Sequence, residues 1–353
     1  MKIRLAILES DEGYLKRIVS VFSTKYADKF EIYSFTELEN ALQSLAPSKI
    51  DVFVANESFE IDHARIPKRC GFAYFVDSAD VDLLNNQPTI CRFQKADLIY
   101  KQILSIYSEN AGNYKELKLT DDGCRVIAFT SPGGGVGCTT MAAACAMHFA
   151  AQGRKALFLN LESFGTSDDF FSGEGQFDMS DVIYALKTRK ANLAMKLESC
   201  VKQDPSGVYF FSGAKLALDM LELSTEETLR LISELRLTGS YDYLILDPAF
   251  SLSKDGLSIL HQAHAVVFVG DGSRTSNTKL NRACAALSMK EQSEDAPIMS
   301  RAALLYNKYS SKTGTAVQGV ELRAIGGAQR YEGTVEQILA QLSQKTFFDD
   351  IIR

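Results

Sequence analysis

Short apolar runs alternate with amphipathic stretches along the first third of this 353-residue chain. The short runs predict buried strands, and the amphipathic stretches predict helices. Strands are expected at Ile3–Leu8, Phe30–Tyr33, Val52–Ala55, Phe72–Val76 and Ile90–Phe93, and helices at Tyr14–Phe22, Leu38–Leu45 and Leu98–Tyr107. Strands separated by helices favour a parallel sheet covered on both faces, so residues 1–108 are expected to have a flavodoxin-like layout.

Residues 109–122 (ENAGNYKELKLTDD) interrupt this alternation, because they are polar, contain a glycine and lack periodicity. They are predicted to be a linker. Beyond them the alternation resumes, with strands expected at Val126–Phe129, Ala156–Leu161, Val208–Phe211, Tyr243–Asp247, Ala265–Val269 and Ala302–Tyr306, and helices at Thr139–Ala151, Asp181–Lys187, Leu193–Glu198, Thr225–Leu237, Lys254–His261, Ser276–Met289 and Thr334–Leu342. The predicted fold class is therefore α/β, with two doubly wound parallel-sheet domains at residues 1–108 and 123–353.

Composition narrows the class of protein. A formal net charge of -6 gives no general attraction to nucleic acid or anionic lipid, so no nucleic-acid partner and no direct membrane insertion are expected. The seven cysteines are scattered and never form a CxxC pair, which favours a reducing cytoplasm over a disulfide framework or a zinc site. No apolar run approaches the ~18 residues of a membrane span, and a secretory leader is not expected, because a strand pattern begins within two residues of Met1.

The stretch SPGGGVGCTT at residues 131–140 lies between a predicted strand and a predicted helix. A glycine-rich turn in this position points backbone N–H groups and the positive end of a helix at one place, where a phosphate can bind. Cys138 stands where a P-loop carries its lysine, and Pro132 replaces the first glycine of the motif. The loop therefore has the form of a phosphate cradle without its main charge.

Other residues give this loop candidate partners. The Thr139 hydroxyl and the Asp247 carboxylate are expected to hold Mg²⁺, with waters. The amide of Asn307 has a donor and an acceptor that can meet an adenine edge. The expected nucleotide-binding residues are Gly133, Gly134, Gly135, Val136, Gly137, Cys138, Thr139, Thr140 and Asn307, with ATP and Mg²⁺ as cofactors. No catalytic residue is certain, and Glu162 and Asp247 are the candidates; taken singly, each feature also fits a glycine turn, a helix cap, a strand end or a loop.

The second domain resembles the deviant Walker A ATPases of the MinD/ParA group. Their pattern is KGGVGKTT, and residues 133–140 are GGGVGCTT, so Gly133 replaces the signature lysine and Cys138 the general P-loop lysine. The resemblance assigns the Walker B acid to Asp247 and an adenine-reading role to Asn307, and it places Asn160-Leu161-Glu162 where the group has Asp-x-Asp. Losing one charge-assisted hydrogen bond to a bound anion lowers binding affinity by about tenfold to somewhat over a hundredfold. Losing one preorganised donor to the transition state lowers the reaction rate by about 10²–10³. Nucleotide binding with slow or absent hydrolysis is expected. Rescue by Arg274, by Lys279 or by a residue of a second subunit is the less favoured alternative.

The first domain resembles the phospho-receiver domain of two-component signalling. Acidic residues Glu9 and Asp11 follow its first strand, and Asn56 ends the third strand, where a receiver has its phosphorylated aspartate. An amide cannot form an acyl phosphate, so a pseudo-receiver is predicted. Glu9 and Asp11 also fit residues that simply begin a helix. Arg92 and Lys95 both lie near the place of the receiver lysine, and the sequence does not choose between them.

A receiver-like domain without its phospho-aspartate, followed by a MinD/ParA-like domain, is similar to the TadZ/CpaE family. The resemblance implies a cytoplasmic ATP-binding homodimer that helps to place and assemble a tight-adherence (type IV-like) pilus, at a pole and membrane-associated through its partners. The partners implied are pilus or secretion-machinery proteins. Two alternatives stay open, an active ParA/MinD-type ATPase that positions DNA or protein and a phosphorylation-responsive regulator. The apolar stripe at the C-terminus, from Ile338 to Ile352, is expected to pack in the core or against a partner, because its polar side is acidic rather than basic.

Overall fold

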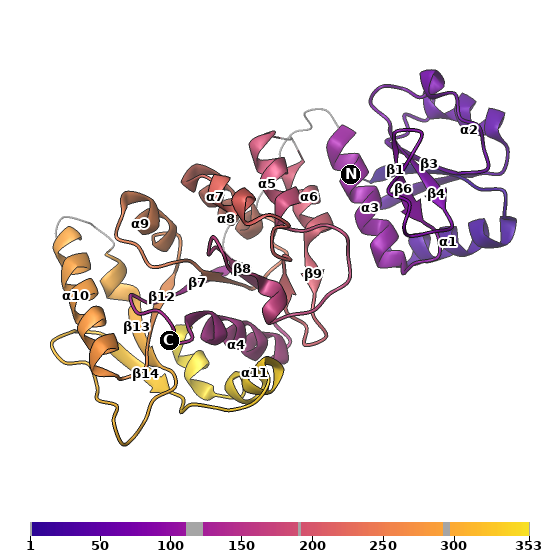
Figure 1. Cartoon of the computed structure of the whole chain (residues 1–353). Coiled ribbons are helices and arrows are strands. Elements are labelled where there is room, and N and C mark those ends of the chain that lie inside the picture. Colours follow the sequence, from indigo (N-terminus) through magenta and orange to yellow (C-terminus); the bar gives the residue numbers. More distant parts are fainter. Residues whose placement is uncertain (1, 111–122, 190–191, 292–296, 353) are drawn as a thin grey trace. The chain divides into compact units, whose positions relative to one another are not determined.

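The computed structural model describes residues 2–110, 123–189, 192–291 and 297–352. The chain forms two compact units, shown in Figure 1. Of the described residues, those within 2–110 and 188–200 form unit 1, and those within 123–187 and 201–352 form unit 2. Most of the predicted linker, residues 111–122, lies outside the described residues.

Unit 1 is built on a six-stranded sheet. Its strands are β1 (Ile3–Leu8), β2 (Phe30–Phe35), β3 (Val52–Asn56), β4 (Gly71–Val76), β5 (Leu83–Leu84) and β6 (Gln87–Cys91). Their order is β2-β1-β3-β4-β6-β5, and every pair is parallel except the β5–β6 hairpin. The hairpin turns at Asn85 and Asn86, whose positive φ angles of 51° and 60° are those of the turns that suit tight hairpins. The parallel core confirms the predicted flavodoxin-like layout.

Helices cover both faces of this sheet. They are α1 (Glu12–Lys25), α2 (Leu38–Leu45), α3 (Ala96–Asn110) and α6 (Leu193–Cys200), with a 3₁₀ turn at His63–Arg65. Buried side chains of α1 and α3, such as Phe22 and Ile103, share one apolar cluster with the sheet, while Leu42 and Leu45 of α2 belong to another. The two clusters lie on opposite faces because neighbouring strand residues such as Ile7 and Leu8 divide between them.

Helix α6 comes from the middle of the sequence but packs against α3 in unit 1. The Lys196 side chain is buried, and its Nζ donates to Ser105 Oγ at 2.8 Å and lies 3.6 Å from Glu109 Oε1. The Tyr100 hydroxyl donates to Glu198 Oε1 at 2.7 Å. The segment that the sequence assigned to the second domain therefore carries a helix that contributes to the first unit.

Replacing Lys196 by alanine is expected to loosen α3 and α6 together, because it removes a buried hydrogen bond and the packing of the lysine stem. The expected loss of stability is about 1–3 kcal/mol. Hydrogen–deuterium exchange at the α3 amides measures it. Lys16→Ala is the matched control, because the Lys16 side chain is 77% exposed in an i,i+4 pair, and protection of α3 should then stay unchanged. Equal α3 exchange in both variants would contradict a structural role for α6.

Unit 2 contains an eight-stranded sheet. Its strands are β7 (Arg125–Thr130), β8 (Ala156–Asn160), β9 (Lys202–Gln203), β10 (Tyr209–Phe210), β11 (Tyr243–Asp247), β12 (Ala265–Gly270), β13 (Ala302–Tyr306) and β14 (Arg323–Gly327). They lie in the order β14-β13-β12-β7-β11-β8-β10-β9 and are parallel except for the β9–β10 pair. The central position of β7 places the glycine-rich loop at the middle of the carboxyl edge of the sheet, where ligands of open α/β sheets bind.

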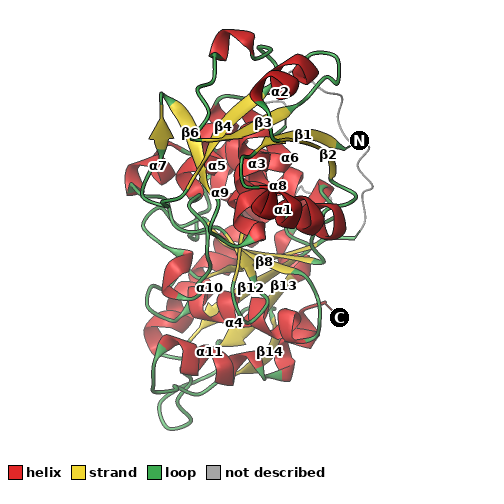
Figure 2. Cartoon of the chain, turned by 90° about the vertical axis from the view of Figure 1, so that its right-hand side faces the viewer, coloured by secondary structure: helices red, strands yellow, loops and turns green. Residues whose placement is uncertain are grey.

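The helices of unit 2 include one that is almost wholly buried, α4. The helices of unit 2 are α4 (Cys138–Ala151), α5 (Met179–Lys187), α7 (Ala217–Glu222), α8 (Thr225–Leu237), α9 (Lys254–Leu260), α10 (Arg274–Lys290) and α11 (Val335–Ser343). The unit also has 3₁₀ segments at Ser167–Asp169, Ile298–Arg301 and Thr346–Ile352. Figures 1 and 2 show α11 beside α4. Leu342, Phe348 and Ile351 from the C-terminal stripe join the core cluster that contains α4, so the core role expected for this stripe is confirmed. Within the described part of the chain, no helix combines the length and apolarity that a membrane crossing requires.

Candidate functional site

The glycine-rich loop connects β7 to α4, and its conformation depends on glycine at two positions. Gly135 and Gly137 have φ angles of 75° and 83°, in the left-handed region that side chains with a Cβ rarely adopt. A Cβ on Gly137 would lie 2.4 Å from Asn307 Nδ2, so space as well as backbone angle excludes a larger residue there. Ser131 Oγ anchors the start of the loop, because it donates to Val269 O at 2.7 Å and accepts from Gly133 N at 3.1 Å.

Asn307 is brought to the loop, as the sequence predicted, but its amide is used within the protein. The side chain is buried, and Nδ2 donates to Val136 O at 3.0 Å. The backbone N–H of Asn307 donates to Gly270 O at 2.8 Å, which fixes the residue at the end of β13. Asn307 therefore braces the loop in this structure. That Asn307 contacts adenine stays a prediction. Such a contact would use the amide oxygen of Asn307, or would require that its hydrogen bond to Val136 O breaks.

Asp247 lies at the carboxyl end of β11, and its buried carboxylate is unpaired among the described residues. It is 1% exposed, and neither carboxylate oxygen has a hydrogen-bond partner among the residues that the structure describes. Burial, together with the smaller effect of the negative charge of Glu162, raises the pKa of Asp247 to about 7. The Thr139 hydroxyl is close enough to lower this pKa in part, although it makes no hydrogen bond of regular geometry. Thr139, Asp247 and Glu162 thus converge beside the loop.

This arrangement fits a magnesium ion. Mg²⁺ prefers oxygen ligands and is commonly held by one or two carboxylates together with substrate phosphates and waters. Asp247 offers unused oxygen lone pairs in a buried position, and Thr139 adds a hydroxyl at the start of α4. In the described ranges no cluster of three or more His, Cys, Asp or Glu side chains could hold a metal by itself. The ion would therefore depend on the phosphates of a nucleotide for the rest of its coordination.

Cys138 and Asn160 supply neither charge nor base. Burial raises the pKa of the Cys138 thiol well above its usual range, and the carboxylates of Asp247 and Glu162 act in the same direction, so the side chain is neutral. Asn160 Oδ1 accepts from Glu162 N at 2.9 Å, and its Nδ2 is buried without a hydrogen-bond partner in the described part of the chain. The position of the P-loop lysine is thus uncharged, and the residue that ends β8 cannot take a proton.

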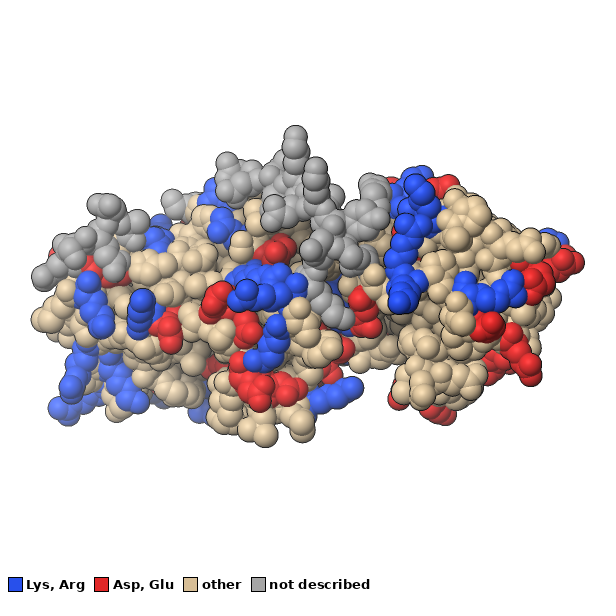
Figure 3. Space-filling view, turned by 90° about the horizontal axis from the view of Figure 1, so that it is seen from above, with Lys and Arg blue, Asp and Glu red and all other residues tan. Residues whose placement is uncertain are grey.

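Cations near the loop come from two other elements. Arg274 and Lys279, the rescue candidates from the sequence, lie on α10 with Arg282 and line an open hollow of about 520 Å³ next to Pro132. Figure 3 shows Lys and Arg gathered at the end of unit 2 that carries α10. Lys308, which was not predicted from the sequence, contacts the loop directly, because its Nζ donates to Gly135 O at 2.9 Å. The only sequence signal for it is its place immediately after Asn307.

His261 and His264, three residues apart in the sequence, have separate partners. His264 Nδ1 accepts from Val126 N at 2.9 Å, and His261 Nδ1 lies 3.4 Å from Arg301 Nη2. Each imidazole therefore has a structural contact of its own.

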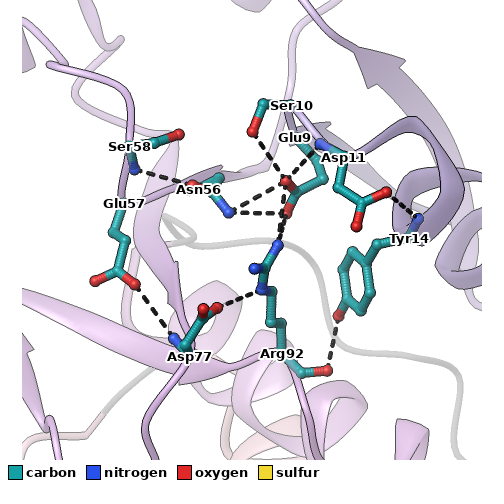
Figure 4. Close-up of polar contacts among 9 residues, drawn as sticks. All are labelled: Glu9, Ser10, Asp11, Tyr14, Asn56, Glu57, Ser58, Asp77 and Arg92. Atoms are coloured by element: carbon teal, nitrogen blue, oxygen red, sulfur yellow. Dashed lines mark hydrogen bonds and ion pairs between the residues drawn. The ribbon is translucent and has the colours of Figure 1, made fainter.

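In unit 1, the pocket that corresponds to a receiver phosphorylation site is filled by the protein itself (Figure 4). Glu9 is fully buried and accepts bonds to both carboxylate oxygens from Asn56 Nδ2, at 3.1 and 3.0 Å. Arg92 Nη1 lies 3.4 Å from both Glu9 oxygens, and Arg92 Nε donates to Asp77. Arg92, rather than Lys95, is therefore the cation that enters the pocket. The guanidinium and the amide satisfy Glu9 where a receiver would hold a metal ion.

Asp11 has the ordinary helix-start role. Its Oδ1 accepts from Tyr14 N at 3.0 Å and caps α1, and this bond lowers the pKa of Asp11. Of the two acidic residues after β1, one is thus a cap and the other is the centre of a closed polar network.

Comparisons with known proteins agree with both units. Residues 1–108 match the family model of the TadZ-like receiver domain, and residues 124–291 match that of an AAA domain. These matches confirm the domain pairing on which the resemblance to the TadZ/CpaE family rests. A search among curated proteins gave no match.

Solved structures of ParA and MinD proteins resemble part of this chain. A ParA family ATPase from Chlorobium tepidum is 19% identical over 65% of this chain and 98% of its own, with a TM-score of 0.52. MinD in the MinC:MinD complex of Aquifex aeolicus is 17% identical over 65% of this chain and 95% of its own, with a TM-score of 0.48. MinD from Pyrococcus horikoshii, complexed with Mg-ADP, is 18% identical over 62% and 94%, with a TM-score of 0.46. The first of these supports the predicted P-loop fold of the ParA type.

Proposed function

We propose that this chain, which joins a TadZ-like receiver domain to an AAA domain with the ParA fold, binds ATP with Mg²⁺ and hydrolyses it slowly or not at all. The observation that carries the proposal is the buried Asp247 carboxylate, whose oxygens have no partner in the described residues, beside Thr139 and a preformed glycine loop. Leaving such a carboxylate buried and unpaired is costly unless a cation completes it.

Each residue of the site has a binding role that follows from its position. The N–H groups of the loop and the start of α4 face a bound phosphate, and Gly135 and Gly137 keep that backbone accessible. Thr139 and Asp247 would hold Mg²⁺, which on binding neutralises phosphate charge. Asn307 fixes the loop through Val136 O. Together these contacts hold a nucleotide in place.

The same site lacks the groups that accelerate hydrolysis. Cys138 is neutral, Gly133 has no side chain, and Asn160 cannot accept a proton. Stabilising the charge that develops during phosphoryl transfer depends on preorganised cations, and each missing donor costs about 10²–10³ in rate. The nucleotide therefore serves as a structural or regulatory ligand. Glu162 is the remaining acid that could orient a water, so any residual ATP turnover would depend on it.

The cellular role proposed is a dimeric factor for the localisation and assembly of a tight-adherence pilus. It rests on the pairing of a TadZ-like receiver domain with a ParA-type unit. The homodimer, the cytoplasmic and polar location, and contacts with pilus or secretion proteins belong to this proposal. The rival role as a phosphorylation-responsive regulator is disfavoured by the closed network of Glu9, Asn56 and Arg92.

Calorimetry with ATP and Mg²⁺, paired with a turnover assay on the same sample, tests the proposal. Binding is expected in the wild type, and Thr139→Ala should weaken it about tenfold or more, because a hydroxyl ligand of the ion is lost. Thr24→Ala is the matched control, since Thr24 is an exposed threonine of α1 in unit 1, and its affinity should equal that of the wild type. Turnover should not exceed that of Thr139→Ala. Absence of binding at millimolar ATP would refute the proposal, and brisk turnover would favour an active ParA-type ATPase.

A further inference from the structure

We propose that Lys308 supplies from outside the P-loop the phosphate-binding positive charge that Gly133 and Cys138 do not provide. The inference rests on the proposed binding of ATP and names a residue that acts in it. Lys308 belongs neither to the glycine-rich stretch nor to the strand-end acids, and it directly follows β13.

The side chain of Lys308 lies along the loop. Its Nζ donates to Gly135 O at 2.9 Å, and its Cε lies 3.4 Å from the position that a Cβ on Gly137 would take. The lysine thus passes over the two left-handed glycines that shape the phosphate cradle. A Cβ on Gly137 would come into contact with Lys308 and would clash with Asn307.

The backbone at Lys308 is held in a conformation that lysine does not favour. Its φ angle is 55°, in the left-handed region, where a residue with a Cβ is strained by about 1 kcal/mol or more. Hydrogen bonds on either side maintain it, from Asn307 N to Gly270 O at 2.8 Å and from Tyr309 N to Ala328 O at 3.0 Å. Glycine or asparagine would fit this conformation with less strain. A strained lysine at this place is therefore a reason to look for a function of its ammonium group.

The ammonium group of Lys308 is available to a ligand. The residue is exposed, and within the described ranges no carboxylate lies within 4.0 Å of Nζ. Because a lysine ammonium has three donors, its single bond to Gly135 O leaves capacity for phosphate oxygens. Its long flexible stem lets a compact charge move towards a bound anion, as lysine does in other phosphate sites.

The other cations near the loop are less well placed for this role. Arg274, Lys279 and Arg282 line the hollow on α10 and make no hydrogen bond to the loop in the described residues. Lys308 is the cation whose contact with the cradle is already formed. The geometry therefore favours it as the group that meets the phosphates.

Substitutions that separate charge from hydrogen bonding test this role. Lys308→Gln keeps an N–H donor, on a side chain one bond shorter, but has no charge, whereas Lys308→Arg keeps the charge. Titration with Mg-ATP is expected to show a 10- to 100-fold loss of affinity for Lys308→Gln and a change of less than about threefold for Lys308→Arg. Lys308→Asn is a second uncharged variant that tolerates the positive φ, and it should lose affinity to the same extent even if the glutamine variant folds poorly.

Lys312→Gln is the matched control, because Lys312 is another exposed lysine a few residues further along the same connection. Its affinity for Mg-ATP should be that of the wild type. Titration with inorganic tripolyphosphate adds a readout without a base, and the uncharged Lys308 variants should lose affinity for it in the same proportion. The affinity for adenosine should not change.

The outcomes are distinct. Wild-type affinity in Lys308→Gln and Lys308→Asn, with ATP bound normally, would overturn the inference and leave the proposed function intact. Equal losses in Lys308→Gln and Lys308→Arg would show that the residue only braces the loop, which also overturns it. No binding of Mg-ATP by the wild type would overturn the proposed function and this inference together.

Discussion

Replacing Asp247 by asparagine is expected to stabilise the nucleotide-free protein at pH 8 while it abolishes Mg²⁺-dependent nucleotide binding. The Asp247 carboxylate is 1% exposed and has no hydrogen-bond partner in the described residues, so its ionised form is destabilising in the folded state. Asparagine has nearly the same shape without the charge. The gain in free energy of unfolding is expected to be about 2–4 kcal/mol at pH 8, since a raised pKa of this size corresponds to that order of energy.

The pH dependence of this effect follows from the raised pKa of Asp247, about 7 in the folded state against 3.8 normally. Between these values the folded protein holds a proton that the unfolded chain has lost. The free energy of unfolding contributed by this group therefore falls as the pH rises from about 4 to about 7, and it is constant above that. In Asp247→Asn this part of the pH dependence should disappear. Urea unfolding followed by circular dichroism at pH 5 and pH 8 measures the difference.

Asp255→Asn is the matched control, because Asp255 lies exposed in the first turn of α9. It should leave both stability and Mg-ATP affinity unchanged. Binding of Mg-ATP near pH 6.5 should also release protons from the wild type, because the ion requires the ionised carboxylate. Calorimetry in two buffers with different heats of ionisation detects this release. If Asp247→Asn destabilises the nucleotide-free protein at pH 8, the carboxylate has a partner that the structure does not show.

Elements with strong periodicity or a clear cap were predictable from the sequence. Helix α8 has the predicted bounds, Thr225–Leu237, and Ser224 and Glu227 form the capping box that their spacing indicated. Strand β11 also has its predicted bounds, because it is apolar throughout and ends at a charged residue. Strand β14 was not predicted, since Arg323–Gly327 is short, glycine-rich and largely exposed at the edge of the sheet.

Packing between helices that lie far apart in the sequence could not be predicted from the sequence. Helix α6 has an ordinary amphipathic pattern, and nothing local indicates that it packs on α3. The resemblance to the MinD/ParA group did predict that Asp247 and Asn307 act together with the glycine loop, and the carboxyl ends of their parallel strands share one edge of the sheet. The bond from Asn307 to Val136 O and the contact of Lys308 depend on side-chain directions beyond the strand ends. Likewise, the sequence could not show that Arg92 rather than Lys95 contacts Glu9, because Glu9 and Arg92 lie far apart in the chain.

Replacing Arg92 by methionine is expected to destabilise unit 1 by about 3 kcal/mol or more, the usual cost of leaving one partner of a buried ion pair alone. Glu9 is fully buried, and Arg92 Nη1 lies 3.4 Å from its Oε2. Arg92 also lies over the Phe93 ring at 4.8 Å and the Tyr14 ring at 5.7 Å, so methionine removes a cation–π contribution as well. The loss should appear as faster hydrogen–deuterium exchange in β1 and β3.

A double-mutant cycle with Glu9→Gln separates the ion pair from packing. Because Glu9→Gln removes the buried charge, adding Arg92→Met to it should cost much less than Arg92→Met alone, with a coupling of about 1–3 kcal/mol. Arg65→Met is the matched control, since Arg65 forms an ion pair with Glu39 on the surface and should show little effect. Additive effects of the two pocket substitutions would mean that Arg92 acts through its packing against Tyr14 and Phe93. A clear coupling would mean that the guanidinium takes the electrostatic place that a receiver gives to its metal ion, which explains how the domain keeps its fold with Asn56 in its pocket.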